Sequence, residues 1–168
     1  MAKSSKKKSV VTGKVIVRNR KAGFEYHLED RFEAGISLLG SEVKSLRAGK
    51  ISLVDAYVEI EHGELWLVNA HIGEYVFANR LNHTPRRRRK LLMHKIEIIR
   101  LGVKIREKGF TIIPISLYFN PKGKIKVEIA LARGKKAHDK REAIREKDQN
   151  RLARRGELQG RHFAPPGK

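Results

Sequence analysis

The sequence predicts a mainly β protein: a small antiparallel barrel with about three accessory helices and a disordered basic C-terminal tail. Two patterns predict the barrel. The first 130 residues alternate apolar and polar positions between short turn signals, and a single longer segment has the period of a helix. The tail is predicted because residues 133–168 hold twelve Lys/Arg against five Asp/Glu and only scattered large apolar residues, too few for a core.

The N-terminal elements follow in order. Residues 1–12 are low in complexity, so we expect them to be disordered. Alternation at Phe24, Tyr26 and Leu28 predicts a strand, and a second strand is expected over 34–39. Residues 41–49 predict a short helix that ends at Gly49.

The middle of the chain predicts a hairpin, a loop and a helix. Residues 57–72 form the hairpin, with His62-Gly63 as its turn. Residues 78–85 are expected to be a loop. The helix is predicted over 86–107, because Leu92, Ile96, Ile99 and Val103 recur as one stripe that we expect to be buried.

The last two strands are the clearest. Residues 110–119 lead into the turn at 120–123, and apolar residues then alternate with polar or small ones over 125–131. Short strands with one inserted helix favour an OB-like barrel over 13–132, a fold that binds nucleic acid across one face. The chain therefore divides into a basic N-terminus (1–12), the barrel (13–132) and the tail (133–168).

The charge of the chain indicates a polyanionic partner. The formal net charge is +20 with a pI near 10.5. Residues 1–21 carry eight Lys/Arg and no acid, and residues 86–90 are five consecutive cations. Nucleic acid is favoured over membrane, because no stretch approaches ~18 apolar residues and the tail lacks bulky apolar side chains opposite its charges. The absence of cysteine and of a secretion signal predicts a cytoplasmic protein.

The tail has a weak helical signal. Asp139 and Glu142 imitate a capping box, so residues 139–155 can become helical, yet an isolated helix of this length is marginal in water. We expect the tail to be disordered until it meets a partner. The alternative is a solvated tail without function.

Enzyme signatures are incomplete. Gly49-Lys50 resembles part of a phosphate loop, but Lys44 and Ile51 stand where that motif needs Gly and Ser/Thr. His94 and Glu97 lack the third ligand of a metal site. We therefore expect a binding protein that has no catalytic residue, metal or cofactor.

Six motifs occur in order along the chain. They are Asn19-Arg20-Lys21-Ala22, then FEAGI from Phe32, LLGSEVKSLRAGK over 38–50, VDAYVEI from Val54, RKLLMHKIEI from Arg89 and ARGKKAHDKRE from Ala132. Together they resemble the SsrA-binding protein (small protein B) family, the bacterial partner of transfer-messenger RNA. The resemblance runs from about residue 10 to about residue 155.

The resemblance implies a function without catalysis. Members of that family have an OB-like barrel that binds the tRNA-like domain of transfer-messenger RNA, which elongation factor Tu carries to stalled ribosomes. The tail enters the decoding centre and the empty mRNA channel of the small ribosomal subunit, where it contacts rRNA and becomes helical. The nascent chain is then tagged and the ribosome freed. We expect a monomer with these partners and no membrane partner.

The resemblance also implies RNA-facing residues on the barrel: Asn19, Arg20, Tyr26, Glu33, Lys44, Arg47, Tyr57, Lys90 and Leu92. Cations would bind phosphates, tyrosines would stack on unpaired bases, and the Asn and Glu side chains would bind base edges or 2′-hydroxyls. Alternatives stay open: Tyr26 is in phase with core residues, Leu92 belongs to the helical stripe, and Lys44 and Arg47 can be solvated charges.

In the tail, the resemblance covers Gly134, Lys135, Lys136, His138, Asp139, Lys140 and Arg141. Gly134 would let the chain leave the last strand, and His138 would stack on a base of the decoding centre. After Arg155 the resemblance fades. The alternative from a different class is a ribosomal structural protein whose basic extensions bind rRNA; an RNA-processing enzyme would need a carboxylate cluster for metal ions that the sequence does not present.

Overall fold

The computed structural model describes residues 13–136, 139, 141, 144–145 and 148–153. The chain divides into two compact units, of which the first ends at Gly134 and the second begins at Lys135. We call the described residues 13–134 the body and the described residues from Lys135 onward the tail.

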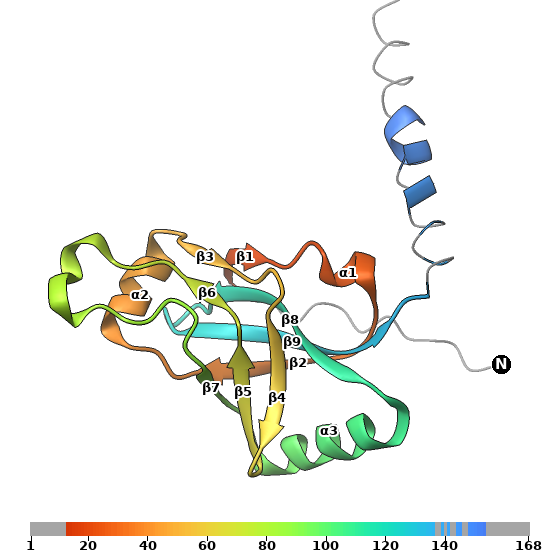
Figure 1. Cartoon of the computed structure of the whole chain (residues 1–168), viewed down its shortest axis with the longest axis horizontal. Coiled ribbons are helices and arrows are strands. Elements are labelled where there is room, and N and C mark those ends of the chain that lie inside the picture. The colour runs from red at the N-terminus through yellow and green to blue at the C-terminus, as the bar shows by residue number, and fades with distance from the viewer. Residues whose placement is uncertain (1–12, 137–138, 140, 142–143, 146–147, 154–168) are drawn as a thin grey trace, which may run out of the picture. The chain divides into compact units, whose positions relative to one another are not determined.

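Nine strands and four helical segments make up the body (Figure 1). The strands are β1 (Lys14–Arg18), β2 (Tyr26–Ile36), β3 (Ile51–Ser52), β4 (Tyr57–Glu61), β5 (Glu64–Val68), β6 (His71–Ile72), β7 (Arg89–Leu92), β8 (Thr111–Phe119) and β9 (Ile125–Gly134). The α-helices are α1 (Ala22–Glu25), α2 (Gly40–Arg47) and α3 (Lys95–Lys108), and η1 (Val76–Leu81) is a 3-10 helix.

Six strands of the large sheet close on themselves, and β1 is added at the edge of β8. The strand order is β1-β8-β4-β5-β7-β2-β9, and β8 pairs in addition with β9, so the sheet is ring-like. Every pairing is antiparallel, as predicted. Strands β3 and β6 form a separate small sheet.

The core fills the inside of this ring. Leu65 and Leu67 of β5, Leu117 of β8, and Val127 and Ile129 of β9 are fully buried. On β5 the buried leucines alternate with the more exposed Glu64, Trp66 and Val68, which is the period of two that a one-sided strand requires.

Two predicted turns have the backbone that their residues favour. His62 (φ 51°) and Gly63 (φ 74°) form the turn between β4 and β5, which confirms the predicted hairpin turn. Gly123 (φ 73°) lies between β8 and β9. The predicted hairpin of residues 57–72 extends only to Val68, because His71 and Ile72 pair with β3.

The predicted helix of residues 86–107 is wrong in its start and in its buried face. Residues 89–92 form β7, where Leu91 pairs with Leu65, and α3 begins only at Lys95. The predicted stripe is exposed, at 53% for Leu92, 65% for Ile96, 66% for Ile99 and 49% for Val103. The helix carries a second apolar stripe at Ile98, Leu101 and Ile105, which packs on the core. Both stripes have helical spacing, so the period alone cannot show which of the two faces the core.

Three smaller boundaries also differ from the prediction. Phe24 belongs to α1, so the strand that we predicted around it begins at Tyr26. The strand expected over 34–39 is the end of β2, which stops at Ile36. Part of the predicted loop of residues 78–85 is the 3-10 helix η1.

In the tail, Asp139, Arg141, residues 144–145 and residues 148–153 are helical. Asp139 Oδ2 accepts a hydrogen bond from the backbone N–H of Lys136, three residues before it, at 3.2 Å. The capping box predicted from Asp139 and Glu142 includes a residue outside the described part of the chain, so it stays a prediction. Disorder of the free tail stays a prediction, and residues 1–12 lie outside the described part of the chain.

Candidate nucleic-acid interface

The predicted RNA-facing residues of the body do not form one patch. The structure distributes most of them over three surfaces, which we call the α1 hollow, the β2 patch and the α2 tip. Arg20, which directly precedes Lys21 of the hollow, is exposed.

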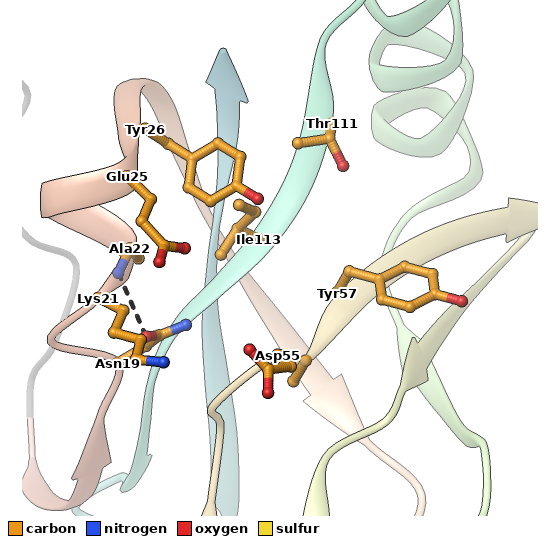
Figure 2. A pocket seen from close by; sticks show the side chains of 10 residues that line it. Asn19, Lys21, Ala22, Glu25, Tyr26, Asp55, Tyr57, Thr111 and Ile113 are labelled. Atoms are coloured by element: carbon orange, nitrogen blue, oxygen red, sulfur yellow. Dashed lines mark hydrogen bonds between the residues drawn. The ribbon is translucent and has the colours of Figure 1, made fainter. Parts of the chain in front are cut away.

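The α1 hollow brings Asn19, Tyr26 and Tyr57 together around a cavity of about 350 Å³ (Figure 2). Glu25, Asp55 and Lys21 also line it, so its wall has two carboxylates against one cation. Such a wall offers acceptors for base edges and 2′-hydroxyls rather than a site for phosphate.

Asn19 holds together the backbone segments that line the hollow. Its Nδ2 donates to the backbone carbonyls of Leu53 (3.3 Å) and Pro114 (3.2 Å), and its Oδ1 accepts from the Ala22 backbone N–H (3.2 Å). Both of its amide hydrogens are therefore used within the body. Asn19 can contact RNA only as an acceptor, through the remaining lone pair of Oδ1.

The two tyrosines of the hollow differ in exposure. Tyr26 is half-buried and packs against the small cluster that contains Ala22 and Ile113, which agrees with the core alternative for this residue. Tyr57 is 42% exposed at the start of β4. Tyr57 is the better placed of the two to stack on a base.

The β2 patch consists of Glu33, Leu92 and Lys126 around Gly35. Gly35 of β2 pairs with Leu92 of β7 on one side and with Lys126 of β9 on the other, so the three residues form a row across the strands. Glu33 lies two residues before Gly35 and on the same face. A Cβ on Gly35 would meet the Leu92 Cβ at 3.2 Å, so glycine lets the exposed leucine lie over the strand.

Glu33 has structural partners in the β2 patch. Its Oε2 accepts a hydrogen bond from the hydroxyl of the buried Tyr118, and its Oε1 lies 3.3 Å from Lys126 Nζ. Burial raises the pKa of Tyr118, and the hydrogen bond to the Glu33 carboxylate raises it further. Lys126 is not among the residues predicted from the sequence, because no local pattern separates it from Lys122 and Lys124. Only its register with Gly35 does.

The α2 tip carries Lys44 and Arg47, three residues apart on α2 and both exposed. Lys44 Nζ lies 5.2 Å from the centroid of the Tyr75 ring, a cation–π contact. In Figure 1, α2 and the yellow-green η1 lie at one end of the body and α1 lies toward the other. The tip is therefore a surface separate from the α1 hollow.

The run of five cations at residues 86–90 is largely neutralised by carboxylates. Arg88 pairs with Glu59 (2.6 Å) and Glu61 and lies 5.3 Å from the Trp66 centroid, while Lys90 pairs with Glu64. Arg88 and Lys90 thus share their charge with carboxylates of the β4–β5 hairpin, and both side chains remain partly exposed.

Arg89 and Glu42 form the buried part of the run. Both side chains are fully buried, and Arg89 Nε donates to Glu42 Oε1 at 2.8 Å. Arg89 also donates to the carbonyls of Ala70, Pro85 and Arg87, and Glu42 accepts from Arg87 and from the Leu39 backbone N–H. Burial alone would raise the pKa of Glu42, but the hydrogen bonds from Arg87 and Leu39 and the charge of Arg89 lower it overall.

Among the described residues, no group of three or more His, Asp or Glu side chains is arranged to hold a metal ion. In the part of the chain that the structure describes, no helix is long and apolar enough to cross a bilayer.

Comparison with known proteins identifies the family. The sequence model of the SmpB protein family matches residues 16–158, which include nearly all of the body. The chain belongs to the SmpB family. It is 52% identical over 148 residues to the SsrA-binding protein of Azorhizobium caulinodans, an alignment that covers 88% of this chain and 92% of the relative. It is 56% identical over 147 residues to the SsrA-binding protein of Symbiobacterium thermophilum, with the same two coverages.

A solved structure agrees with the family assignment. One chain from work described as "tmRNA-SmpB: a journey to the center of the bacterial ribosome" has a TM-score of 0.63 and 47% sequence identity to this protein. The match covers 77% of this chain and 94% of that chain. The likeness therefore includes both sequence and fold.

The tail residues that the resemblance singled out are described only in part. Gly134 ends β9 and still pairs with Tyr26, so the chain leaves the sheet after Gly134. Lys135, Lys136, Asp139 and Arg141 are described, whereas His138 and Lys140 lie outside the described residues. The roles of these residues stay predictions.

Proposed function

We propose that this protein binds the tRNA-like domain of transfer-messenger RNA and acts in trans-translation at the ribosome. One observation carries the proposal: the chain is 47% identical, over 77% of its length, to a chain from a tmRNA–SmpB study of the bacterial ribosome. The net charge of +20 supports a polyanionic partner, because neutralising phosphates releases counterions.

The body would read the RNA through different chemistry at different surfaces. Tyr57 would stack on an unpaired base at the α1 hollow, while Glu25 and Asp55 would accept from base edges or 2′-hydroxyls. At the β2 patch, Leu92 would pack on a sugar or base and Lys126 would bind a phosphate. The exposure of Leu92 supports this role, since a buried leucine could not touch RNA.

The tail would have a separate role on the small ribosomal subunit. In this proposal, elongation factor Tu delivers the complex of RNA and monomeric protein to a stalled ribosome. The tail then fills the decoding centre and the empty mRNA channel as a helix, and its cations hold rRNA phosphates. The proposal places the protein in the bacterial cytoplasm and gives it no catalytic step.

The body's part is tested by competition binding over a salt series. The tRNA-like domain of transfer-messenger RNA is labelled, and ordinary tRNA serves as competitor. We expect the preference for the tRNA-like domain to persist at high salt, because contacts to bases are less salt-dependent than contacts to phosphates. Equal affinities that fall together as salt rises would leave only non-specific RNA binding.

The tail's part is tested by truncation. We expect a chain that ends at Gly134 to keep its affinity for the tRNA-like domain and to lose tagging of nascent peptides. The cut follows Gly134 because Leu131 and Ala132 are buried in β9, so that an earlier cut would damage the core. Loss of RNA binding by this folded truncation would refute the division between body and tail.

A further inference from the structure

The segment around η1 presents large apolar side chains to solvent. Phe77 is 80% exposed and Val76 is 70% exposed, the two highest values for large apolar residues in the described part of the chain. Neither belongs to the α1 hollow or to the β2 patch. Because exposing an aromatic ring to water is unfavourable, such a surface indicates a binding site.

The segment is held rigidly at its base. Asn82 Oδ1 accepts from the Tyr75 backbone N–H (3.1 Å), and Asn82 Nδ2 donates to the Tyr75 carbonyl (3.0 Å), so one side chain closes the loop. The adjacent His83 is buried, with Nδ1 3.0 Å from Ser41 Oγ of α2 and Nε2 3.1 Å from the Ile72 carbonyl. The backbone that carries the rings is thus anchored at both ends of the segment, which lowers the entropy lost on binding.

Two aromatic rings and an exposed cation are in contact at this surface. The rings of Phe77 and Tyr75 meet edge to face, with centroids 5.6 Å apart and planes at 64°. Lys44 lies over the Tyr75 ring, and Arg47 follows one turn later on α2. Lys50 lies beside the start of this segment, because its backbone carbonyl accepts a hydrogen bond from the Gly73 backbone N–H at 2.9 Å.

The charges nearby favour an anionic partner. One exposed acid, Glu74, belongs to this segment, whereas three exposed cations, Lys44, Arg47 and Lys50, lie on or just after α2. Glu42 of α2 is buried and paired with Arg87 and Arg89, so it does not face the surface. A second copy of a chain with a net charge of +20 would be repelled, which argues against self-association here.

We propose that the α2 tip, extended to Tyr75 and Phe77, is a further RNA-binding surface, beside the α1 hollow and the β2 patch, that stacks an unpaired base on Phe77. The flanking phosphates are held by Lys44 and Arg47. Exposed aromatic rings beside cations are how proteins bind single-stranded segments without reading their sequence. The inference rests on the proposed function in taking RNA as the partner, and it adds residues that the predicted interface did not contain.

The test replaces Phe77 in the full-length chain and measures Kd for two RNA probes, the tRNA-like domain of transfer-messenger RNA and vacant small ribosomal subunits. We expect Phe77→Ala and Phe77→Leu to weaken binding to at least one probe by about five-fold or more, and Phe77→Tyr to bind like the parent. Leucine keeps the apolar surface but has no ring face. The matched control is Ile99→Ala, an exposed apolar residue of α3, and we expect its Kd to be unchanged.

Two outcomes would overturn the inference. Unchanged Kd values for both probes in all Phe77 variants would mean that the surface serves a partner other than RNA. Parental affinity of Phe77→Leu together with weak binding of Phe77→Ala would mean apolar packing rather than stacking. Failure of the proposed function looks different, because the unmodified chain would then show no preference for the tRNA-like domain over ordinary tRNA.

Discussion

Removing the carboxylate of Glu42 tests the buried ion pair directly. In Glu42→Ala, Arg89 keeps its hydrogen bonds to the carbonyls of Ala70, Pro85 and Arg87 but loses its buried counter-charge. Arg87 is 30% exposed at its side chain and can turn to water, whereas Arg89 has no exposed surface. The cost therefore comes mainly from Arg89.

The expected loss in the free energy of unfolding is large for a domain of this size. Breaking a buried ion pair by removing one partner costs about 3–5 kcal/mol, because the other charge stays buried without compensation. We expect the melting temperature to fall by about 10 °C or more. The measurement is thermal unfolding followed by circular dichroism at neutral pH.

Two comparisons make the result interpretable. Glu64→Gln breaks the half-exposed pair with Lys90, and we expect it to change stability by no more than about 1 kcal/mol. The double variant Glu42→Leu/Arg89→Met removes both buried charges, so we expect it to recover part of the loss. A melting temperature for Glu42→Ala within the range of Glu64→Gln would refute the reasoning, since Arg89 would then not depend on its partner.

The remaining predictions concern pH and the β2 patch. The pKa of Glu42 is lowered by folding, so the stability that this carboxylate contributes is present above its unfolded pKa of about 4.5 and is lost as pH falls through the folded pKa. In urea unfolding, Glu42→Gln should therefore lose less stability on acidification than the parent protein does. The pKa of Tyr118 is raised by folding, so the stability that its neutral hydroxyl contributes is present below the unfolded pKa of 10.0 and is lost as pH rises toward the folded pKa. Tyr118 should therefore ionise after the other tyrosines in an alkaline titration, and Tyr118→Phe should remove the tyrosinate absorbance that appears last. Leu92→Ser should leave the melting temperature within a few degrees, at about 0.5 kcal/mol or less, but weaken binding to the tRNA-like domain, and a large loss of stability would show that Leu92 is structural. Glu33→Ala leaves the buried Tyr118 hydroxyl without its acceptor, so we expect a loss of about 1–3 kcal/mol in stability beside any loss of RNA affinity; unchanged thermal unfolding would contradict the role of this hydrogen bond.

Much of the β body follows from local pattern. The strand predicted over 125–131, the turn residues at 62–63 and the small helix ending before Gly49 all depend on neighbours within a few positions, and each is found in the structure. The strand at Arg89–Leu92 was missed because its apolar residues also fit a helical period that continues into α3. Local spacing alone could not separate these two readings.

The candidate interface was predictable as a set of residues but not as surfaces. The ordered motifs identify the family from sequence, and the family implied residues such as Tyr57 and Leu92. Whether Leu92 is exposed depends on its pairing with Gly35, more than fifty positions away, and Lys126 joins it only through the register of β9. The apolar and cationic surface at Phe77 carries no local signal that distinguishes it from a core segment.

Sequence by itself determined the fold class, the turns, the family and the excess of positive charge, because these depend on residue type and near-neighbour spacing. Tertiary structure alone decided which cations are available to a polyanion. Glu42 of α2 lies 45 residues from Arg87 and 47 from Arg89, and Glu59 lies 29 from Arg88, so only the packing of α2 and the neighbouring strands β4, β5 and β7 brings these charges together. A charge's effect depends on burial and on partners within a few ångströms, and both are set by the packed strands rather than by the order of residues along the chain.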